Sequence, residues 1–255
     1  MGILENKNII VMGIRNKKSI AWGIAKRAYE QGATIILTYE TEKDKSHVEE
    51  LSKHFENVII KQCDVTNDKQ VETLFHELKK ELHEIHGIAH CIAHANQHDL
   101  RKGFLSTSRE GFSHAMDVSA YSLVTISKHA KDLMHNGGSI VTLTYYGASK
   151  VMSGYNVLGV AKAALEGAVR YLANELGPIG IRVNTISPGP IKTGSSKDIN
   201  DFDNLYENVE RKSPLRKSVT PEDIGDATVF FLSDLSKSVT GEILYVDNGY
   251  NIMGD

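Results

Sequence analysis

The 255-residue sequence has few cysteines, no long apolar run and no block of basic residues. Its two cysteines, Cys63 and Cys91, lie in apolar, strand-like stretches, which predicts buried free thiols and excludes a disulfide framework. No apolar run approaches the roughly 20 residues of a membrane-spanning helix. Lysines and arginines are interspersed with acids at a net charge of -3, so a nucleic-acid-binding surface and a membrane protein are not expected.

The first ten residues also lack a targeting pattern. MGILENKNII carries an acid and a lysine where a secretory signal peptide has its apolar segment. Asn6 stands where a myristoylation signal requires Ser or Thr. We therefore expect a cytoplasmic protein.

Short apolar runs alternate with longer segments of helical period almost to the end of the chain. Strands are predicted at 8–12, 34–39, 58–63, 87–95, 138–144, 181–186 and 242–247. Helices are predicted at 20–31, 43–55, 67–84, 108–134, 157–176 and 221–232. A repeated alternation of strand and helix implies right-handed crossovers and a mainly parallel sheet that helices cover on both faces. The predicted fold is a single α/β domain over residues 1–255, a Rossmann-like doubly wound parallel sheet of about seven strands with helices on both faces.

One long stretch, 187–215, interrupts this alternation. It follows a predicted strand, and its composition is too polar for a buried core. We expect an irregular, mobile segment that covers the substrate.

The segment after the first predicted strand has features of a dinucleotide-binding loop. It reads GIRNKKSIAWG and lacks the usual G-x-G-x-x-G. Gly13 allows the chain to turn and the backbone to approach a pyrophosphate, Ser19 lies near the helix start, and Gly23 is expected to let the helix pack closely on the sheet. Each glycine alone is typical of an ordinary turn, but together with the alternating pattern they indicate a dinucleotide site.

Acidic residues follow the second and third predicted strands. Glu40 stands where a carboxylate binds adenine ribose hydroxyls and repels a 2′-phosphate, which favours NADH over NADPH. A solvated loop acid is the alternative for Glu40, because Lys43 and Lys45 are close by. Asp64 could accept a hydrogen bond from the adenine amino group, with Val65 against the ring, or it could serve a turn.

The run YNVLGVAK, residues 155–162, contains a candidate catalytic pair. In a helix, residues seven apart lie about 20° from the same face and roughly 10 Å apart along the axis, so Tyr155 and Lys162 could face one pocket. Ordinary carbonyl reductases place the Tyr four residues before such a Lys, and here that position is Leu158. Spacing alone is also compatible with a core tyrosine and a surface lysine.

The wider spacing fits one reaction better than another. In a ketone, the hydride goes to the carbon that bears the oxygen, so acid and hydride donor converge on adjacent atoms. In an α,β-unsaturated thioester, the hydride goes to the β-carbon and the oxyanion develops farther away, so the acid must stand farther from the nicotinamide. Lys162 would supply positive charge and hold the nicotinamide ribose, and the Tyr155 hydroxyl would bind the developing enolate.

Four segments carry a resemblance to a known family: YNVLGVAKAALEGAVRYLANELGPIGIRVNTISPGPIKT, GIRNKKSIAWGIA, QCDVTND and SDLSKSVTGEILYVDNGY. Over nearly its whole length the chain resembles NADH-dependent enoyl-(acyl carrier protein) reductases, the divergent branch of the short-chain dehydrogenase/reductase superfamily. The Tyr-x6-Lys pair and the Gly-x5-Ser-x-Ala-x-Gly loop are the most specific elements.

The resemblance implies reduction of the trans-2 double bond of an enoyl thioester, carried by acyl carrier protein or coenzyme A, in fatty-acid elongation. It implies NADH as cofactor, with NADPH possible, and a homotetramer. Tyr155 would be the catalytic tyrosine, Lys162 the cofactor-holding lysine, and Tyr145 a second active-site tyrosine at the acyl pocket, with Ala95, Tyr145 and Tyr155 as substrate contacts. Cofactor contacts would be Gly13, Ser19, Ile20, Glu40, Asp64, Val65, Ile92, Lys162, Ile191, Lys192, Thr193, Gly194 and Ser195.

The chain departs from the family pattern at three positions expected around the acyl pocket. His94 replaces a usual Phe, Pro188 a common Ala, and Tyr146 a frequent Leu. These differences bear on acyl-chain length and inhibitor response.

Two other patterns give alternatives. Tyr146 and Lys150 have the spacing of the ordinary carbonyl-reductase pair, so a ketone or 3-ketoacyl thioester reductase is the second enzyme hypothesis. A non-catalytic dinucleotide-binding sensor is the hypothesis from a different class. His86, His90, His94 and His98 recur every fourth residue, but on a predicted strand they lie far apart, so no metal site is expected.

Overall fold

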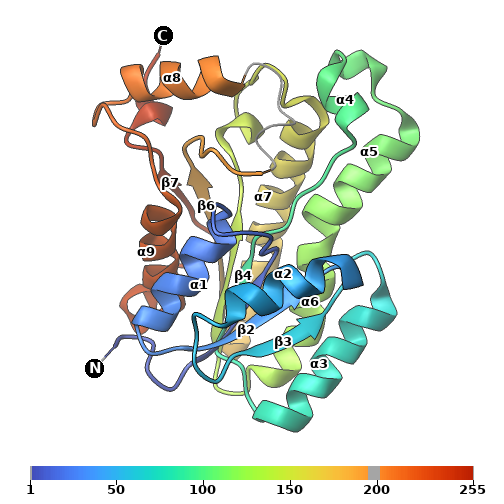
Figure 1. Cartoon of the computed structure of the whole chain (residues 1–255), viewed down its shortest axis with the longest axis vertical. Coiled ribbons are helices and arrows are strands. Elements are labelled where there is room, and N and C mark those ends of the chain that lie inside the picture. The colour runs from blue at the N-terminus through green and yellow to red at the C-terminus, as the bar shows by residue number, and fades with distance from the viewer. Residues whose placement is uncertain (1, 195–201, 255) are drawn as a thin grey trace.

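A computed structural model describes residues 2–194 and 202–254 and places seven strands in one sheet (Figure 1). The order is β3-β2-β1-β4-β5-β6-β7, and neighbouring strands are parallel. The predicted doubly wound sheet is confirmed. The strands are β1 (Asn8–Met12), β2 (Thr34–Tyr39), β3 (Ile59–Gln62), β4 (Gly87–His90), β5 (Gly138–Leu143), β6 (Ile181–Pro188) and β7 (Ile243–Val246).

Helices cover both faces of this sheet. One face carries α1 (Ile20–Glu30), α2 (Glu42–Ser52) and α9 (Pro221–Leu232), and the other carries α3 (Asp68–Leu82), α6 (Ser122–Ala130) and α7 (Asn156–Leu176). The helix α5 (Arg109–Met116) precedes α6, and the short α4 (Gln97–Arg101) and α8 (Phe202–Lys212) lie at the same end of the molecule (Figure 1). Within residues 2–194 and 202–254, no helix is both long and apolar enough to cross a bilayer.

Successive side chains of β1 point to opposite faces of the sheet and so belong to two separate hydrophobic cores. Ile10 and Met12 pack with the helices of the α3, α6 and α7 layer. Ile9 and Val11 pack with those of the α1, α2 and α9 layer. All four side chains are fully buried, as expected for a central strand of a parallel sheet covered on both faces.

Capping residues explain why two helices begin where the sequence predicts. Ser19 caps α1, and its Oγ accepts a hydrogen bond from the Trp22 amide at 3.3 Å. Thr220 and Asp223 form a reciprocal capping box at the start of α9, directly before Pro221. The predicted range 221–232 therefore matches α9.

Three expectations are corrected. The predicted strand 87–95 ends at His90, and the predicted helix 108–134 is divided into α5, a π-helical turn at Asp117–Tyr121, and α6. The stretch 187–215 is not irregular throughout, because it contains the last residues of β6 and the whole of α8. An acid in the first turn of α8 and two basic residues in its last turn suit the helix dipole and could have signalled it.

Gly23 has a different role from the predicted one. A Cβ at Gly23 would lie 2.2 Å from the Pro221 carbonyl oxygen, and a Cβ at Gly225 would lie 2.6 Å from the Gly23 carbonyl oxygen. The two glycines therefore permit the close crossing of α1 with α9. The expectation that Gly23 allows close packing on the sheet is wrong, because the neighbour that approaches it is a helix.

His90 joins β4 to two neighbouring elements through a fully buried imidazole. Its Nδ1 lies 3.0 Å from Thr142 Oγ1 in β5, and its Nε2 lies 2.9 Å from Ser122 Oγ in α6. Burial, reinforced by the charge of Lys162, lowers the pKa of His90 to about 3. The ring is therefore neutral, and both of its nitrogens have hydroxyl partners, so it acts as a structural group.

This burial predicts how stability depends on pH. Because the unfolded chain protonates His90 below its ordinary pKa of 6.5 and the folded chain does not, this group's contribution is fully present above pH 6.5. It is lost as the pH falls from 6.5 towards 3, by about 1.4 kcal/mol per pH unit. Denaturant unfolding at pH 7 and 5.5 should show a shallower pH slope in His90→Gln. The same change at the exposed His76 should leave the slope unaltered, and equal slopes in the parent and His90→Gln would contradict the assignment.

Candidate functional site

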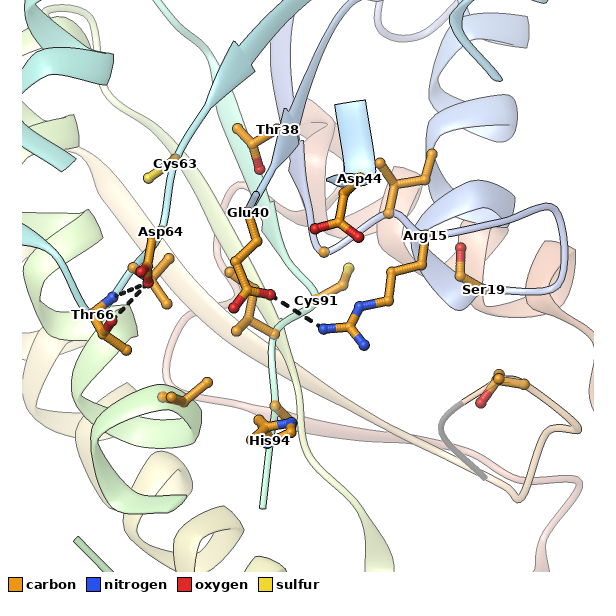
Figure 2. Close-up of a pocket in the computed structure, with 18 of the residues that line it drawn as sticks. Arg15, Ser19, Thr38, Glu40, Asp44, Cys63, Asp64, Thr66, Cys91 and His94 are labelled. Carbon is orange, nitrogen blue, oxygen red and sulfur yellow. Dashed lines mark hydrogen bonds and ion pairs between the residues drawn. The ribbon is translucent and has the colours of Figure 1, made fainter. Parts of the chain in front are cut away.

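A cleft of about 620 Å³ opens at the carboxyl ends of β1, β2, β3 and β4 (Figure 2). Its walls come mainly from the segments that follow these strands, together with His114 of α5, Val118 of the π-helical turn, and Thr193 and Gly194 beyond β6. The chain runs from β1 to β2 and β3 on one side and resumes with β4 on the other, so the loops after β1 and β4 diverge. Open α/β sheets bind nucleotides at such a switch point.

Gly13 brings two of these loops into contact. Its φ is +83°, and a Cβ there would lie 2.1 Å from the Cys91 carbonyl oxygen after β4. A side chain would therefore be both strained and obstructed. This confirms the predicted turn at Gly13 and adds a neighbour, the β4 loop, that the sequence did not identify.

Eight of the predicted cofactor contacts line the cleft together. They are Gly13, Ser19, Glu40, Asp64, Val65, Ile92, Thr193 and Gly194.

Of four other predicted cofactor contacts, three are not among the residues that line the cleft, and one is not among the described residues. Ile20 and the buried Ile191 pack with the α1 layer of the core. Lys192 pairs with Asp203 of α8 at 3.0 Å, and its Nζ stands 4.6 Å from the centre of the Tyr206 ring. Ser195 falls outside the described residues.

The two predicted acids have defined partners. Glu40 Oε2 lies 3.2 Å from Arg15 Nη2, and Figure 2 shows the two side chains directed at one another. Asp64 accepts hydrogen bonds from the Thr66 amide at 2.9 Å and the Thr66 hydroxyl at 2.7 Å. Of the two roles considered for Asp64, the turn is present, and its carboxylate also faces the cleft.

The predicted substrate residues gather in a separate apolar cluster next to α7. Ala95, Tyr145 and Tyr155 belong to it, and the Tyr145 and Tyr155 ring centres lie 4.7 Å apart in an edge-to-face arrangement. Burial raises the pKa of both phenols well above their ordinary value, and the pKa is raised further by Tyr145 at Tyr155 and by Tyr250 at Tyr145. Tyr155 therefore stays protonated and can donate a hydrogen bond.

Lys162 is buried on α7 with 4 % of its surface exposed. Its Nζ donates a hydrogen bond to the Leu143 carbonyl oxygen, 2.6 Å away at the end of β5. Burial lowers the pKa of Lys162 to about 8, while Cys91 and Glu166 act in the opposite direction. Because Cys91 lines the cleft, Lys162 is close to the wall of the nucleotide-type cavity. The alternative interpretation of Lys162 as a surface lysine is therefore wrong.

The helical argument for the Tyr155 and Lys162 spacing fails at its first residue. Tyr155 precedes α7, and Asn156, the first residue of α7, has a left-handed φ of +41°. The Asn156 φ of +41° interrupts regular helix between the pair. The Asn156 Nδ2 donates to the Asp99, Leu100 and Lys102 carbonyl oxygens at 3.3, 2.9 and 2.7 Å, which fixes the entry to α7 against the end of α4.

The residues of the alternative catalytic pair, and those at which the chain departs from the family pattern, lie in different parts of the structure. Tyr146 lies in a short 3₁₀ turn, Tyr146–Ala148, and its ring packs against Tyr245 and Tyr250, with centres 6.4 and 5.9 Å away. Lys150 is exposed. His94 lines the cleft, its ring centre 5.3 Å from that of His114. Pro188 is the last residue of β6 and is buried.

Sequence reasoning missed several residues that line the cleft. They include Arg15, Asn16, Thr38, Asp44, Cys63, Cys91 and His114. Cys63 and Cys91 are free thiols as predicted, and burial raises the pKa of each to about 12. Each cysteine stands one residue before a predicted contact, and that adjacency was an available signal.

Among the described residues, no group of three or more potential ligands could hold a metal ion.

The chain is similar to known proteins over almost its whole length. A family model described as enoyl-(acyl carrier protein) reductase matches residues 13–251. The enoyl-(acyl carrier protein) reductase (NADH) of Bacillus cereus is 48% identical over 256 residues, covering 100% of both chains. The corresponding Bacillus subtilis protein is 50% identical over 251 residues, covering 98% of this chain and 97% of its own.

Solved structures give the same result for the fold. The Bacillus cereus enoyl-acyl carrier protein reductase, crystallised with NADP+ and indole naphthyridinone, superposes with a TM-score of 0.98 at 48% identity over 100% of both chains. The Aquifex aeolicus enoyl-(acyl carrier protein) reductase (NADH) gives 0.96 at 44% identity, again over 100% of both chains.

The lowered pKa of Lys162 is directly testable. In protein carrying ¹³C-labelled lysine, we expect one side-chain resonance to titrate at about pH 8, because burial penalises the ammonium form. The resonance is assigned by its absence from Lys162→Arg. The exposed Lys150, replaced in the same way, serves as the control. A Lys162 signal that titrates at 10 or above would contradict the burial argument.

Proposed function

The chain belongs to the enoyl-(acyl carrier protein) reductase family, and from this premise we propose how its own residues perform the reaction. The reaction is the NADH-dependent reduction of the trans-2 double bond of an enoyl thioester in fatty-acid synthesis. Tyr155 and Lys162 are the proposed catalytic residues, and Tyr145 supports Tyr155. The observation that carries this assignment is the burial of a phenol and an amine at α7, the amine close enough to Cys91 of the cleft lining to interact with it.

The cleft fits a dinucleotide on structural grounds. It lies at the switch point, and Gly13, which lines the cleft with a left-handed φ of +83°, lets the β1 loop pass close to the β4 loop there. Ser19 and the start of α1 face the same space, where helix amides favour a phosphate. Glu40 would hold the adenine ribose, with Asp64 and Val65 near the base. When bound, the reduced nicotinamide supplies a hydride to the β-carbon of the substrate.

Tyr155 acts on the thioester oxygen. As the β-carbon is reduced, negative charge develops on that oxygen, and the Tyr155 hydroxyl donates a hydrogen bond to it. The raised pKa keeps the hydroxyl protonated, and the buried surroundings strengthen the interaction with the developing charge. Tyr145 packs edge-on against Tyr155 and limits the orientations of its ring.

Lys162 supplies the positive charge of the site. With a pKa of about 8, its amine is mostly protonated at neutral pH. The hydrogen bond to the Leu143 carbonyl oxygen fixes its position, so the remaining N–H groups can hold ribose hydroxyls. The ammonium also favours accumulation of negative charge on the substrate oxygen.

The substrate is a thioester of acyl carrier protein, and a coenzyme A thioester is a reasonable surrogate because the reacting atoms are the same. The segment 187–215, which includes α8, is proposed to cover the acyl chain. Its support is the position of α8 and α4 at one end of the molecule (Figure 1). The ion pair between Lys192 and Asp203 of α8 supports it as well. We further propose that the protein is cytoplasmic.

The ketone-reductase alternative has no comparable support. Tyr146 packs in an aromatic group with Tyr245 and Tyr250, and neither Tyr146 nor Lys150 is on α7. The sensor alternative would require loss of the catalytic groups, whereas Tyr155 and Lys162 are present and buried.

Two tyrosine substitutions separate these hypotheses. Tyr155→Phe should lower kcat for crotonyl-coenzyme A reduction about 100-fold, because one donor to the developing oxyanion is removed. The matched Tyr146→Phe should retain activity. The activity of both variants is measured as the loss of NADH absorbance, and their affinity for NADH is determined separately. Full activity of Tyr155→Phe, or a comparable loss in Tyr146→Phe, would contradict the assignment.

A homotetramer is the proposed assembly. Tyr121, Val160 and Tyr171 are exposed by 54%, 38% and 81% on the π-helical turn and the adjoining α7, and association would bury them. Analytical ultracentrifugation should give four times 28.2 kDa, about 113 kDa. Tyr171→Glu should weaken association, because a charge would enter the interface. A mass of one chain for the parent protein would contradict the proposal.

A further inference from the structure

Arg15 has a position in the cleft that the proposed mechanism does not use. The cleft lining contains three carboxylates, Glu40, Asp44 and Asp64, and one guanidinium, Arg15. Arg15 comes from the loop after β1 and reaches the acid that ends β2, with 3.2 Å between Nη2 and Glu40 Oε2 (Figure 2). The basic group therefore lies where an adenine ribose is expected.

The three carboxylates differ in how firmly they are held. Asp44 accepts from the Thr41 amide at 3.1 Å and from its hydroxyl at 2.6 Å, as part of the α2 capping box. Asp64 accepts from the amide and hydroxyl of Thr66. Both are committed to local backbone structure. Glu40 is instead paired with the side chain of Arg15.

The Arg15–Glu40 pair can exchange partners easily. The side chains are 57% and 54% exposed, so water competes with the ion pair and solvates either group after separation. Exposed pairs of this kind contribute little to stability. Neither side chain is locked by burial, and the pair can open without loss of packing.

We propose that Arg15 determines cofactor specificity by exchanging Glu40 for the 2′-phosphate of the adenine ribose, so that the site accepts NADPH as well as NADH. This inference rests on the proposed function, in which Glu40 holds the adenine ribose. With NADH, the ribose hydroxyls donate to Glu40. With NADPH, the phosphate accepts from the guanidinium, whose planar fork suits phosphate oxygens, and Glu40 turns into solvent.

Charge explains why Arg15 is needed for the second cofactor. A 2′-phosphate carries more negative charge than one carboxylate and would face Glu40, Asp44 and Asp64 together. Arg15 compensates this repulsion at the point where it is strongest. Because the groups are exposed, added salt should weaken NADPH binding more than NADH binding.

Direct binding tests the proposal independently of catalysis. Isothermal titration calorimetry with NADH and NADPH gives a Kd ratio for the parent chain, Arg15→Ala, Glu40→Gln and Lys18→Ala. Lys18 is an exposed basic residue of the same loop that does not line the cleft, so it is the matched control. Arg15→Ala should raise Kd(NADPH)/Kd(NADH) by about tenfold or more, whereas Glu40→Gln should lower it.

Two further measurements complete the test. The salt dependence of the NADPH Kd should be shallower in Arg15→Ala, and 2′,5′-ADP should show the same order of affinities as NADPH. Thermal unfolding checks that the variants are folded. An unchanged ratio in Arg15→Ala, or an equal shift in Lys18→Ala, would overturn the role of Arg15.

The proposal and the function on which it rests fail in different ways. If the parent protein reduces crotonyl-coenzyme A with NADH but the Kd ratio does not respond to Arg15→Ala, the specificity role is wrong and the proposed function stands. If the folded protein binds neither dinucleotide, both are overturned.

Discussion

The contact between the β1 and β4 loops at Gly13 is the constraint on which the site depends. Parallel strands direct their carboxyl ends to one edge, and the switch in strand order separates the loops there. Gly13 then lets the β1 loop pass against the Cys91 carbonyl oxygen, which closes the floor of the cleft. The acids after β2 and β3 and the residues after β4 thus face one space, although they come from distant parts of the sequence.

Burial determines the protonation states of the titratable groups near the cleft. It raises the pKa of Tyr155 and lowers those of His90 and Lys162. The result at neutral pH is a neutral phenol, a neutral imidazole and a mostly charged amine. His90 serves the framework through Thr142 and Ser122. Lys162 is buried as a mostly charged amine, and in the proposed mechanism its charge lies where the reaction develops negative charge.

Local patterns predicted the elements, but contacts between distant segments decided much of the site. Pro221, Glu222 and Asp223 indicated the start of α9, because the first turn of a helix is set by neighbours in the chain. Lys43 and Lys45 were the cations weighed against Glu40, whereas its partner is Arg15, 25 positions away. The helical spacing of Tyr155 and Lys162 could not reveal the left-handed Asn156, since that conformation accompanies three hydrogen bonds to the end of α4.

The glycine crossing of α1 with α9 has a consequence for how the protein is made. Gly23 belongs to the first helix and Gly225 to the last long one, so their contact joins segments that leave the ribosome far apart in time. Closing so large a loop is slow compared with forming local helices. The nascent chain must therefore hold its first βαβ unit without the cover of α9 for most of synthesis, and the packing of α1 against α9 is completed late.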